Sequence, residues 1–95
     1  MDLNKMVFRV HAIKRMFERR ISEVDVRHVL EAGEAIESYP KDIPYQSRLI
    51  LGWHGARPIH VVAADNPERA ETIVITVYEP DPAEWGPGFK QRRTR

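Results

Sequence analysis

Residues 57–79 read RPIHVVAADNPERAETIVITVYE, and this stretch decides the fold. Valine, isoleucine and threonine dominate its two ends, as is typical of β-strands. Between the ends lies the run Asp65-Asn66-Pro67-Glu68, whose proline and short polar side chains favour a turn. The stretch therefore predicts two antiparallel strands, Arg57 to Ala64 and Thr72 to Glu79.

A third strand is predicted just before this pair. Ser47 to Trp53 is again rich in branched apolar residues, and the turn His54-Gly55-Ala56 follows it. These strands are expected to form a three-stranded meander. Further upstream, Glu34 to Tyr39 is a short strand candidate that ends at a loop containing two prolines.

The first third of the chain predicts two helices. The first runs from Val10 to Arg20 and is amphipathic, because its apolar residues recur at helical spacing. These residues are Val10, Ile13, Met16 and Phe17. The second helix is predicted to begin at Ser22, an N-cap residue with Asp25 at the capping-box position, and to stop at Gly33.

Composition limits the class of protein. Ninety-five residues suffice for one domain, here a core of about residues 8–89 with a basic tail over 90–95. The fold class is α+β, with two N-terminal helices packed on one face of a sheet of three to four mainly antiparallel strands. Neither a signal peptide nor an apolar run long enough for a membrane span occurs, so the cytoplasm is the expected location.

Charge and cysteine content exclude further classes. The formal net charge is +1, so any role in nucleic-acid binding must depend on a local basic cluster. The chain has no cysteine, which excludes disulfides, thiolate catalysis and cysteine-ligated zinc. No His-Glu-x-x-His pattern and no phosphate-binding glycine loop occurs, so we predict neither a metal site nor a cofactor.

Strand periodicity predicts which side chains share a face of the sheet. Odd-numbered positions of the three strands are mostly apolar and are expected to face the helices. If short loops place Ile50 and Thr76 on either side of His60, the opposite face gathers a set of polar side chains. The set consists of Arg48, His60, Thr76 and Tyr78.

These residue types suit cleavage of RNA by its own 2′-hydroxyl without a metal. That reaction needs a base, an acid and cations for the charge that develops on phosphate. His60 is a candidate base or acid, and Arg48 and Arg57 are candidate phosphate ligands. Tyr78 suits proton donation or base stacking, and His11 is a further candidate at the start of the first helix.

Each candidate also has a structural explanation. His60 also suits a packing role, and Arg15 and Arg19 also suit a solvated helical face. Arg48 also suits an ion pair with an acidic loop residue such as Asp42, and Tyr78 also suits packing beneath Trp85. Composition and spacing leave these alternatives open.

Four segments in this order resemble domain-of-unknown-function family 4258, over roughly residues 8–92. They are HAIKRMFERRIS at 11–22, GEAIESYP at 33–40, RPIHVV at 57–62 and ITVYEP at 75–80. The resemblance implies a fold like that of the small bacterial toxins of RelE and BrnT type, which are messenger-RNA ribonucleases usually without a metal. It also implies a cognate antitoxin partner of the MqsA zinc-finger type.

The resemblance supplies a set of site residues. The positions carried over are His11, Arg15, Arg19, Arg48, Arg57, His60 and Tyr78. Arg20 departs from the glycine that is common in relatives, and the departure affects the turn between the helices.

The predicted function is a toxin-like, metal-independent endoribonuclease. His60, Arg48, Tyr78 and His11 are its predicted catalytic residues, and Arg15, Arg19 and Arg57 its RNA-binding residues. The alternative is a non-catalytic module that binds a partner protein through its sheet face or through Trp85 and Phe89.

Overall fold

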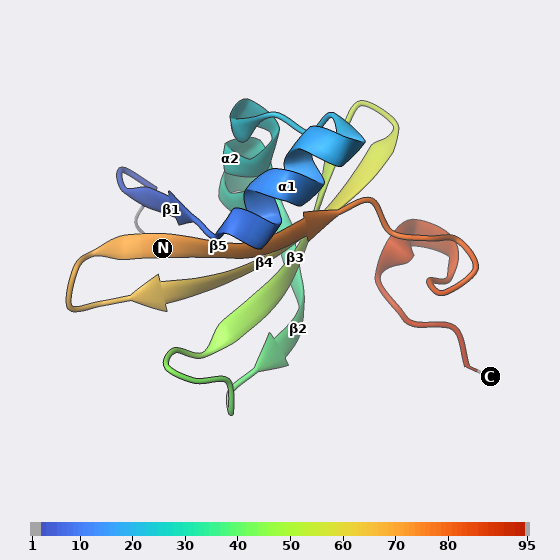
Figure 1. The fold of residues 1–95 in the computed structure, drawn as a ribbon. Helices are drawn as coiled ribbons and strands as arrows, with labels where there is room; N and C mark the ends of the chain where they lie inside the picture. The colour runs from blue at the N-terminus through green and yellow to red at the C-terminus, as the bar shows by residue number, and fades with distance from the viewer. Residues whose placement is uncertain (1–2, 95) are drawn as a thin grey trace.

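The computed structural model describes residues 3–94, which form a five-stranded sheet and two α-helices (Figure 1). The helices are α1 (Val10–Arg19) and α2 (Glu23–Ala32). The strands are β1 (Met6–Phe8), β2 (Glu34–Tyr39), β3 (Ser47–His54), β4 (Arg57–Asn66) and β5 (Glu71–Tyr78). A short 3-10 turn, η1 (Pro87–Phe89), lies near the C-terminus. The α+β class is confirmed.

The sheet is larger and more mixed than the predicted three to four strands. Its order is β1-β5-β4-β3-β2, and the predicted meander β3-β4-β5 is its centre. Strand β1 pairs in parallel with β5, from Met6 opposite Thr72 to Phe8 opposite Val74. A strand of three residues is too short to show an alternating pattern in the sequence, which is why β1 was not predicted.

Both predicted helices form, and local chemistry explains where α2 begins and ends. The side chain of Ser22 accepts from the Asp25 amide and the Asp25 carboxylate accepts from the Ser22 amide, so the predicted capping box is present. Gly33 follows the helix in an extended conformation. A side chain at Gly33 would collide with the carbonyl oxygens of Val29 and Leu51, so close approach explains this glycine.

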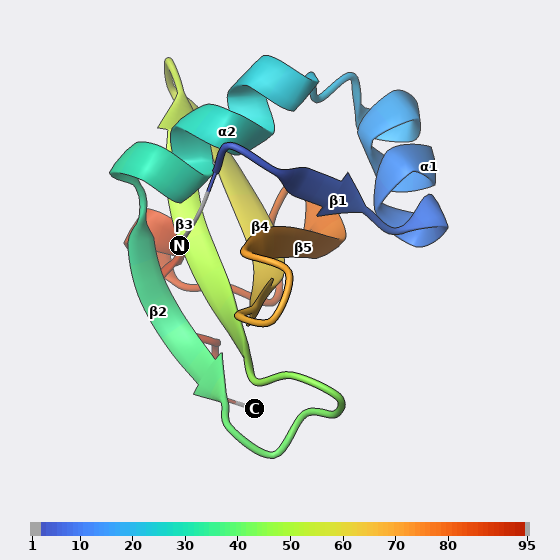
Figure 2. The same ribbon diagram turned by 90° about the vertical axis from the view of Figure 1, so that its left-hand side faces the viewer.

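The helices cover one face of the sheet, α1 over β5 and α2 over β3 and β4 (Figure 2). Contact with α1 runs through Ala12 and the partly buried Met16. The apolar stripe expected on this helix is largely exposed, since Val10, Ile13 and Phe17 all face solvent.

The predicted assignment of faces is wrong in β3 and, before its bulge, in β5, where Val74 faces the helices. Leu51, and not Ile50, lies opposite His60, so Ile50 and Gly52 face the helices while Leu51 and Trp53 face away. The hairpin loop has two residues, since His54 pairs with Arg57, and a change of one residue in loop length moves every side chain of a strand to the other face.

The second face of the sheet is covered by the C-terminal segment, residues 80–93, which lies behind the strands in Figure 2. Trp85 is its anchor and is 2% exposed. Phe89 packs edge-on against Trp53, with 6.1 Å between the ring centroids. Lys90 pairs with Glu34 at 2.9 Å and Arg92 with Glu37 at 3.0 Å, so the basic tail is tied to β2 at these two points.

Candidate functional site

His60 points away from the helices, as predicted, but it does not reach solvent. It lies opposite Tyr78 on β5, and its relative exposure is 0%. The Trp85 ring packs edge-on against the imidazole, with 4.5 Å between centroids. The C-terminal segment therefore seals His60 beneath it, and the predicted open site around His60 is not present in this structure.

The hydrogen bonds of His60 define its tautomer. Nε2 lies 2.9 Å from the Phe89 carbonyl oxygen, which can only accept, so Nε2 carries the proton. Nδ1 lies 3.2 Å from the Tyr78 hydroxyl and accepts from it in the neutral ring. Burial lowers the pKa of His60, which favours this neutral form. The ring thus holds the Tyr78 hydroxyl in place.

Tyr78 is half-buried at the border of the covered area. Burial raises the pKa of its hydroxyl, so the phenol stays protonated at neutral pH. Its ring meets that of His60 edge-on, with 5.2 Å between centroids. The structure therefore brings Tyr78 and His60 together, as the sequence predicted.

His11 on α1 is exposed and contacts the strand that carries Tyr78. Strand β1 stops pairing with β5 at Val74, so α1 lies beside the remainder of β5. From there, His11 Nε2 lies 2.9 Å from the Thr76 hydroxyl oxygen. Thr76 and Tyr78 are two residues apart on β5 and project to the same side. Both imidazoles therefore hydrogen-bond side chains of one strand.

The arginines divide into two groups. Arg15 is exposed on α1 and lies 3.6 Å from Glu18, and Arg19 is exposed at the end of the same helix. Arg57 instead binds Glu79 at 2.5 Å and donates to the backbone carbonyls of Arg19 and Arg20. Arg57 is thus engaged in tying the end of α1 to the sheet.

Arg48 does not join the others. It lies opposite Ala63, on the helix side of the sheet, and pairs with Asp65 at 3.1 Å. The register explains the difference, because Arg48 was expected to share a face with His60 only if Ile50 lay opposite that residue. The alternative expectation for Arg48 was an ion pair with an acidic loop residue such as Asp42. Arg48 does form an ion pair, but its partner is Asp65, and Asp42 binds Ser47 instead.

A polar cluster on the covered face was missed at the sequence level. Both oxygens of Glu37 accept from Arg92, at 3.0 and 3.1 Å, and one also accepts from the Tyr39 hydroxyl at 2.6 Å. The Arg92 guanidinium also lies over the Trp85 ring, 4.6 Å from its centroid. These contacts lower the pKa of Glu37, while burial and the bond to Glu37 raise the pKa of Tyr39 to about 12.

Two kinds of feature are absent from the part of the chain that the structure describes. Within residues 3–94, no group of three or more histidine and acidic side chains gathers in a way that could hold a metal ion. Neither helix in this part of the chain is long and apolar enough to cross a membrane.

The sequence pattern of one family, Domain of unknown function (DUF4258), matches residues 8–79. The match runs from the end of β1 through the end of β5, and it ends before the C-terminal segment that covers His60. No curated protein and no solved structure matches the chain.

Proposed function

We propose that this chain, which belongs to DUF4258, is a metal-independent endoribonuclease whose surface site is formed by His11, Thr76 and Tyr78. The observation that carries the proposal is the exposed His11 imidazole, held 2.9 Å from Thr76 beside the exposed guanidinium groups of its own helix. An exposed imidazole among cations is the arrangement that transfer of a proton beside a phosphate requires.

His11 acts as the base in this proposal. Its imidazole takes the proton of the 2′-hydroxyl, and the 2′-oxygen forms a bond to phosphorus as the bond from phosphorus to the 5′-oxygen breaks. The products are a 2′,3′-cyclic phosphate and a free 5′-hydroxyl. Thr76 is a positioning residue, because its hydroxyl fixes the orientation of the ring.

Tyr78 supplies the proton for the leaving 5′-oxygen. Positions 76 and 78 are about 6.6 Å apart along β5, a span that allows groups at its two ends to flank one phosphate. The phenol is a much stronger acid than a sugar hydroxyl even with its pKa raised by burial. His60 acts through Tyr78 as a positioning residue, since its neutral Nδ1 holds the hydroxyl until substrate binds.

Arg15 and Arg19 bind the RNA backbone in this proposal. Both are exposed on α1, where they can approach phosphates. Arg48 and Arg57 are assigned no role in substrate binding, because Arg48 lies on the helix side of the sheet and Arg57 is held by Glu79 and by backbone carbonyls at the end of α1.

The resemblance to family 4258 implies a placement near the RelE and BrnT toxins, and this implication is the basis for proposing that the enzyme belongs to a toxin–antitoxin pair. On that basis we propose messenger RNA as the substrate and a cognate antitoxin protein as the partner.

The test compares the wild-type protein with two histidine variants. Purified protein is incubated with a 5′-labelled RNA in the presence of a metal chelator, and the ends of the products are identified. We expect cyclic-phosphate ends from the wild type and a loss of about 100-fold or more in His11→Ala, the scale of removing a general base. The matched control is His28→Ala, which removes an exposed histidine of α2 and should leave the rate unchanged. Equal cleavage by His11→Ala contradicts the proposed site.

A second candidate function is a non-catalytic module that binds a partner protein. It is favoured by the complete burial of His60 and by the exposed apolar side chains of α1. Trp85 cannot be the anchor of such an interface, because it is 2% exposed. For this function, wild-type protein should leave the labelled RNA intact, and His11→Ala should behave as wild type in every assay.

A further inference from the structure

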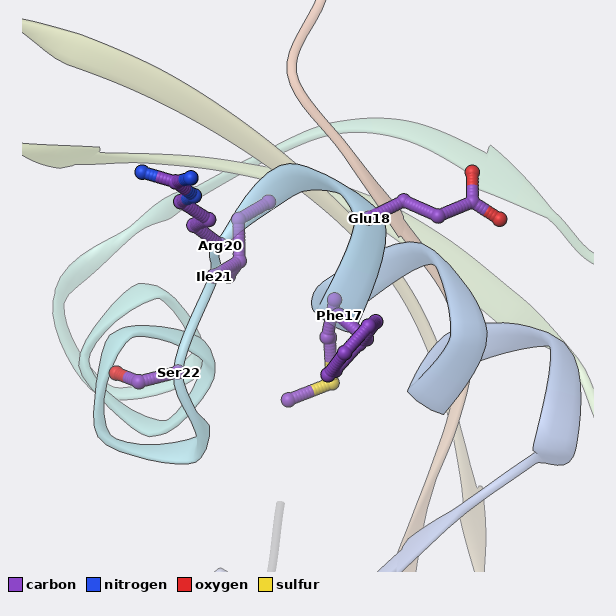
Figure 3. A pocket seen from close by; sticks show the side chains of 6 residues that line it. Phe17, Glu18, Arg20, Ile21 and Ser22 are labelled. Atoms are coloured by element: carbon purple, nitrogen blue, oxygen red, sulfur yellow. The ribbon is translucent and has the colours of Figure 1, made fainter.

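A groove lies at the end of α1, where the chain turns toward the start of α2. Helix α1 packs on β5 and α2 on β3 and β4, so the helices cover different strands. The groove has a volume of about 670 Å³ and is lined by Met16, Phe17, Glu18, Arg20, Ile21 and Ser22. Figure 3 shows Phe17 directed into the opening between the helices, with Ile21 and Ser22 across from it.

Large apolar side chains stand exposed on both helices. Val10 is 82% exposed, Ile13 53% and Phe17 87%, and these three form one row on α1 by their helical spacing. On α2, Val24 is 75% exposed. A row of this kind on a soluble domain, including an almost fully exposed phenylalanine, marks an interaction surface.

The helices carry opposite charge. Apart from Arg15 and Arg19, which are assigned to RNA, α1 and the residue that follows it carry Lys14 and Arg20 against one acidic residue, Glu18. Helix α2 carries Glu23, Asp25 and Glu31 against one basic residue, Arg27. A partner of a single charge would meet repulsion along one of the two helices. A second copy, turned by a two-fold axis, places the basic helix of each chain beside the acidic helix of the other.

We propose that this groove is the interface of a symmetric dimer of the chain, with Phe17 of each copy seated between the helices of the other. The interface is self-complementary, with an apolar centre and a rim of opposite charges, as a two-fold contact requires.

The dimer leaves the proposed ribonuclease site open. His11 and Arg15 lie on the opposite side of α1 from Ile13 and Phe17, by the 3.6-residue period of the helix. The dimer proposal therefore does not depend on the proposed enzymatic function. Substitutions in the groove should not change the rate of RNA cleavage, because no residue that lines the groove belongs to the proposed ribonuclease site.

The test is sedimentation of the full chain over concentrations from about 1 µM to about 1 mM, the range of weak to moderate association. We expect the wild type to reach twice the mass of one chain. Phe17→Glu should raise the dissociation constant by about 30-fold or more, the effect of removing an interface anchor. The matched control is Ile43→Glu, which places the same charge at another exposed isoleucine, 91% exposed, in the loop between β2 and β3, and should not change the association.

A second set of variants tests the role of charge. Lys14→Glu and Glu23→Lys should each weaken the dimer, because each places like charges opposite one another, and the double variant should regain part of the loss. Association of the wild type should also weaken as salt is added. A wild-type chain that stays monomeric throughout overturns the proposal. So does a dimer that Phe17→Glu leaves intact, or one that Ile43→Glu disrupts equally.

Discussion

The two faces of the sheet are covered by different kinds of structure. One face lies under two helices, whose backbone hydrogen bonds are local. The other lies under the irregular segment 80–93, held by Trp85 and by ion pairs to β2. The contacts of this second cover join residues 29 positions apart at His60 and Phe89 and 55 apart at Glu37 and Arg92.

The difference matters for chemistry as well as for folding. The helical cover buries apolar side chains, whereas the C-terminal segment buries a titratable one. Under it, His60 is neutral and its nitrogens are occupied by Phe89 and Tyr78. His11, on helix α1, is instead exposed, so its imidazole can meet a substrate in the proposed function.

The largest expected effect comes from removing the anchor of the irregular cover. Trp85→Ala should lower the free energy of unfolding by about 3–5 kcal/mol, because it deletes a buried ring packed on His60 and Arg92. Urea denaturation measures this loss. Trp53→Ala, at an exposure of 41%, is the control and should cost less than about 1 kcal/mol. Equal losses of stability in the two variants would contradict the assignment of Trp85 as the anchor of the C-terminal segment.

A smaller effect is expected from His60 itself. His60→Gln should cost about 1–3 kcal/mol at pH 8, because it disturbs buried hydrogen bonds.

The same variant should change the pH dependence of stability. The pKa of His60 is lowered in the folded state, so between that pKa and the unfolded value of about 6.5 the unfolded chain binds more protons. The contribution of His60 is therefore complete above about pH 6.5 and is lost as the pH falls toward the folded pKa. Unfolding measured from pH 8 to pH 5 should show a steeper decline for the wild type than for His60→Gln. Parallel curves would contradict the buried neutral ring.

The smallest effect concerns the helical cover. Ser22→Ala should lower stability by about 1 kcal/mol, because it removes one half of the capping box of α2. Thermal unfolding measures the change, and Ser38→Ala on β2, an exposed strand position, is the control with little expected effect. A capping variant as costly as Trp85→Ala would remove the distinction between the two covers.

Local patterns in the sequence predicted the elements well. The capping box of Ser22 and Asp25 and the three strands of the meander are confirmed, because each depends on neighbours within a few residues. Strand β1 could not be predicted, since three residues carry no pattern and its pairing with β5 is distant in the sequence.

It was harder to predict which face of the sheet a side chain lies on and which residues it contacts. A two-residue loop at Gly55 and Ala56 reversed the faces of β3, and a bulge beside Val62 shifted the register along β5. His60 and Tyr78 came together as predicted, whereas Arg48 did not join them. The burial of His60 depends on Trp85 and Phe89. These two large aromatic residues in an irregular segment were the sequence signal for that burial.

The central claim is that the exposed imidazole of His11, and not the buried ring of His60, meets the substrate. Nuclear magnetic resonance of the histidine rings tests it directly, by adding an RNA whose 2′-hydroxyls are replaced by hydrogen so that it binds without being cleaved. The account predicts that the His11 ring signals shift strongly as this RNA is added, while those of His60 shift less, and only through its hydrogen bond to Tyr78. A shift at His60 with none at His11 would contradict it.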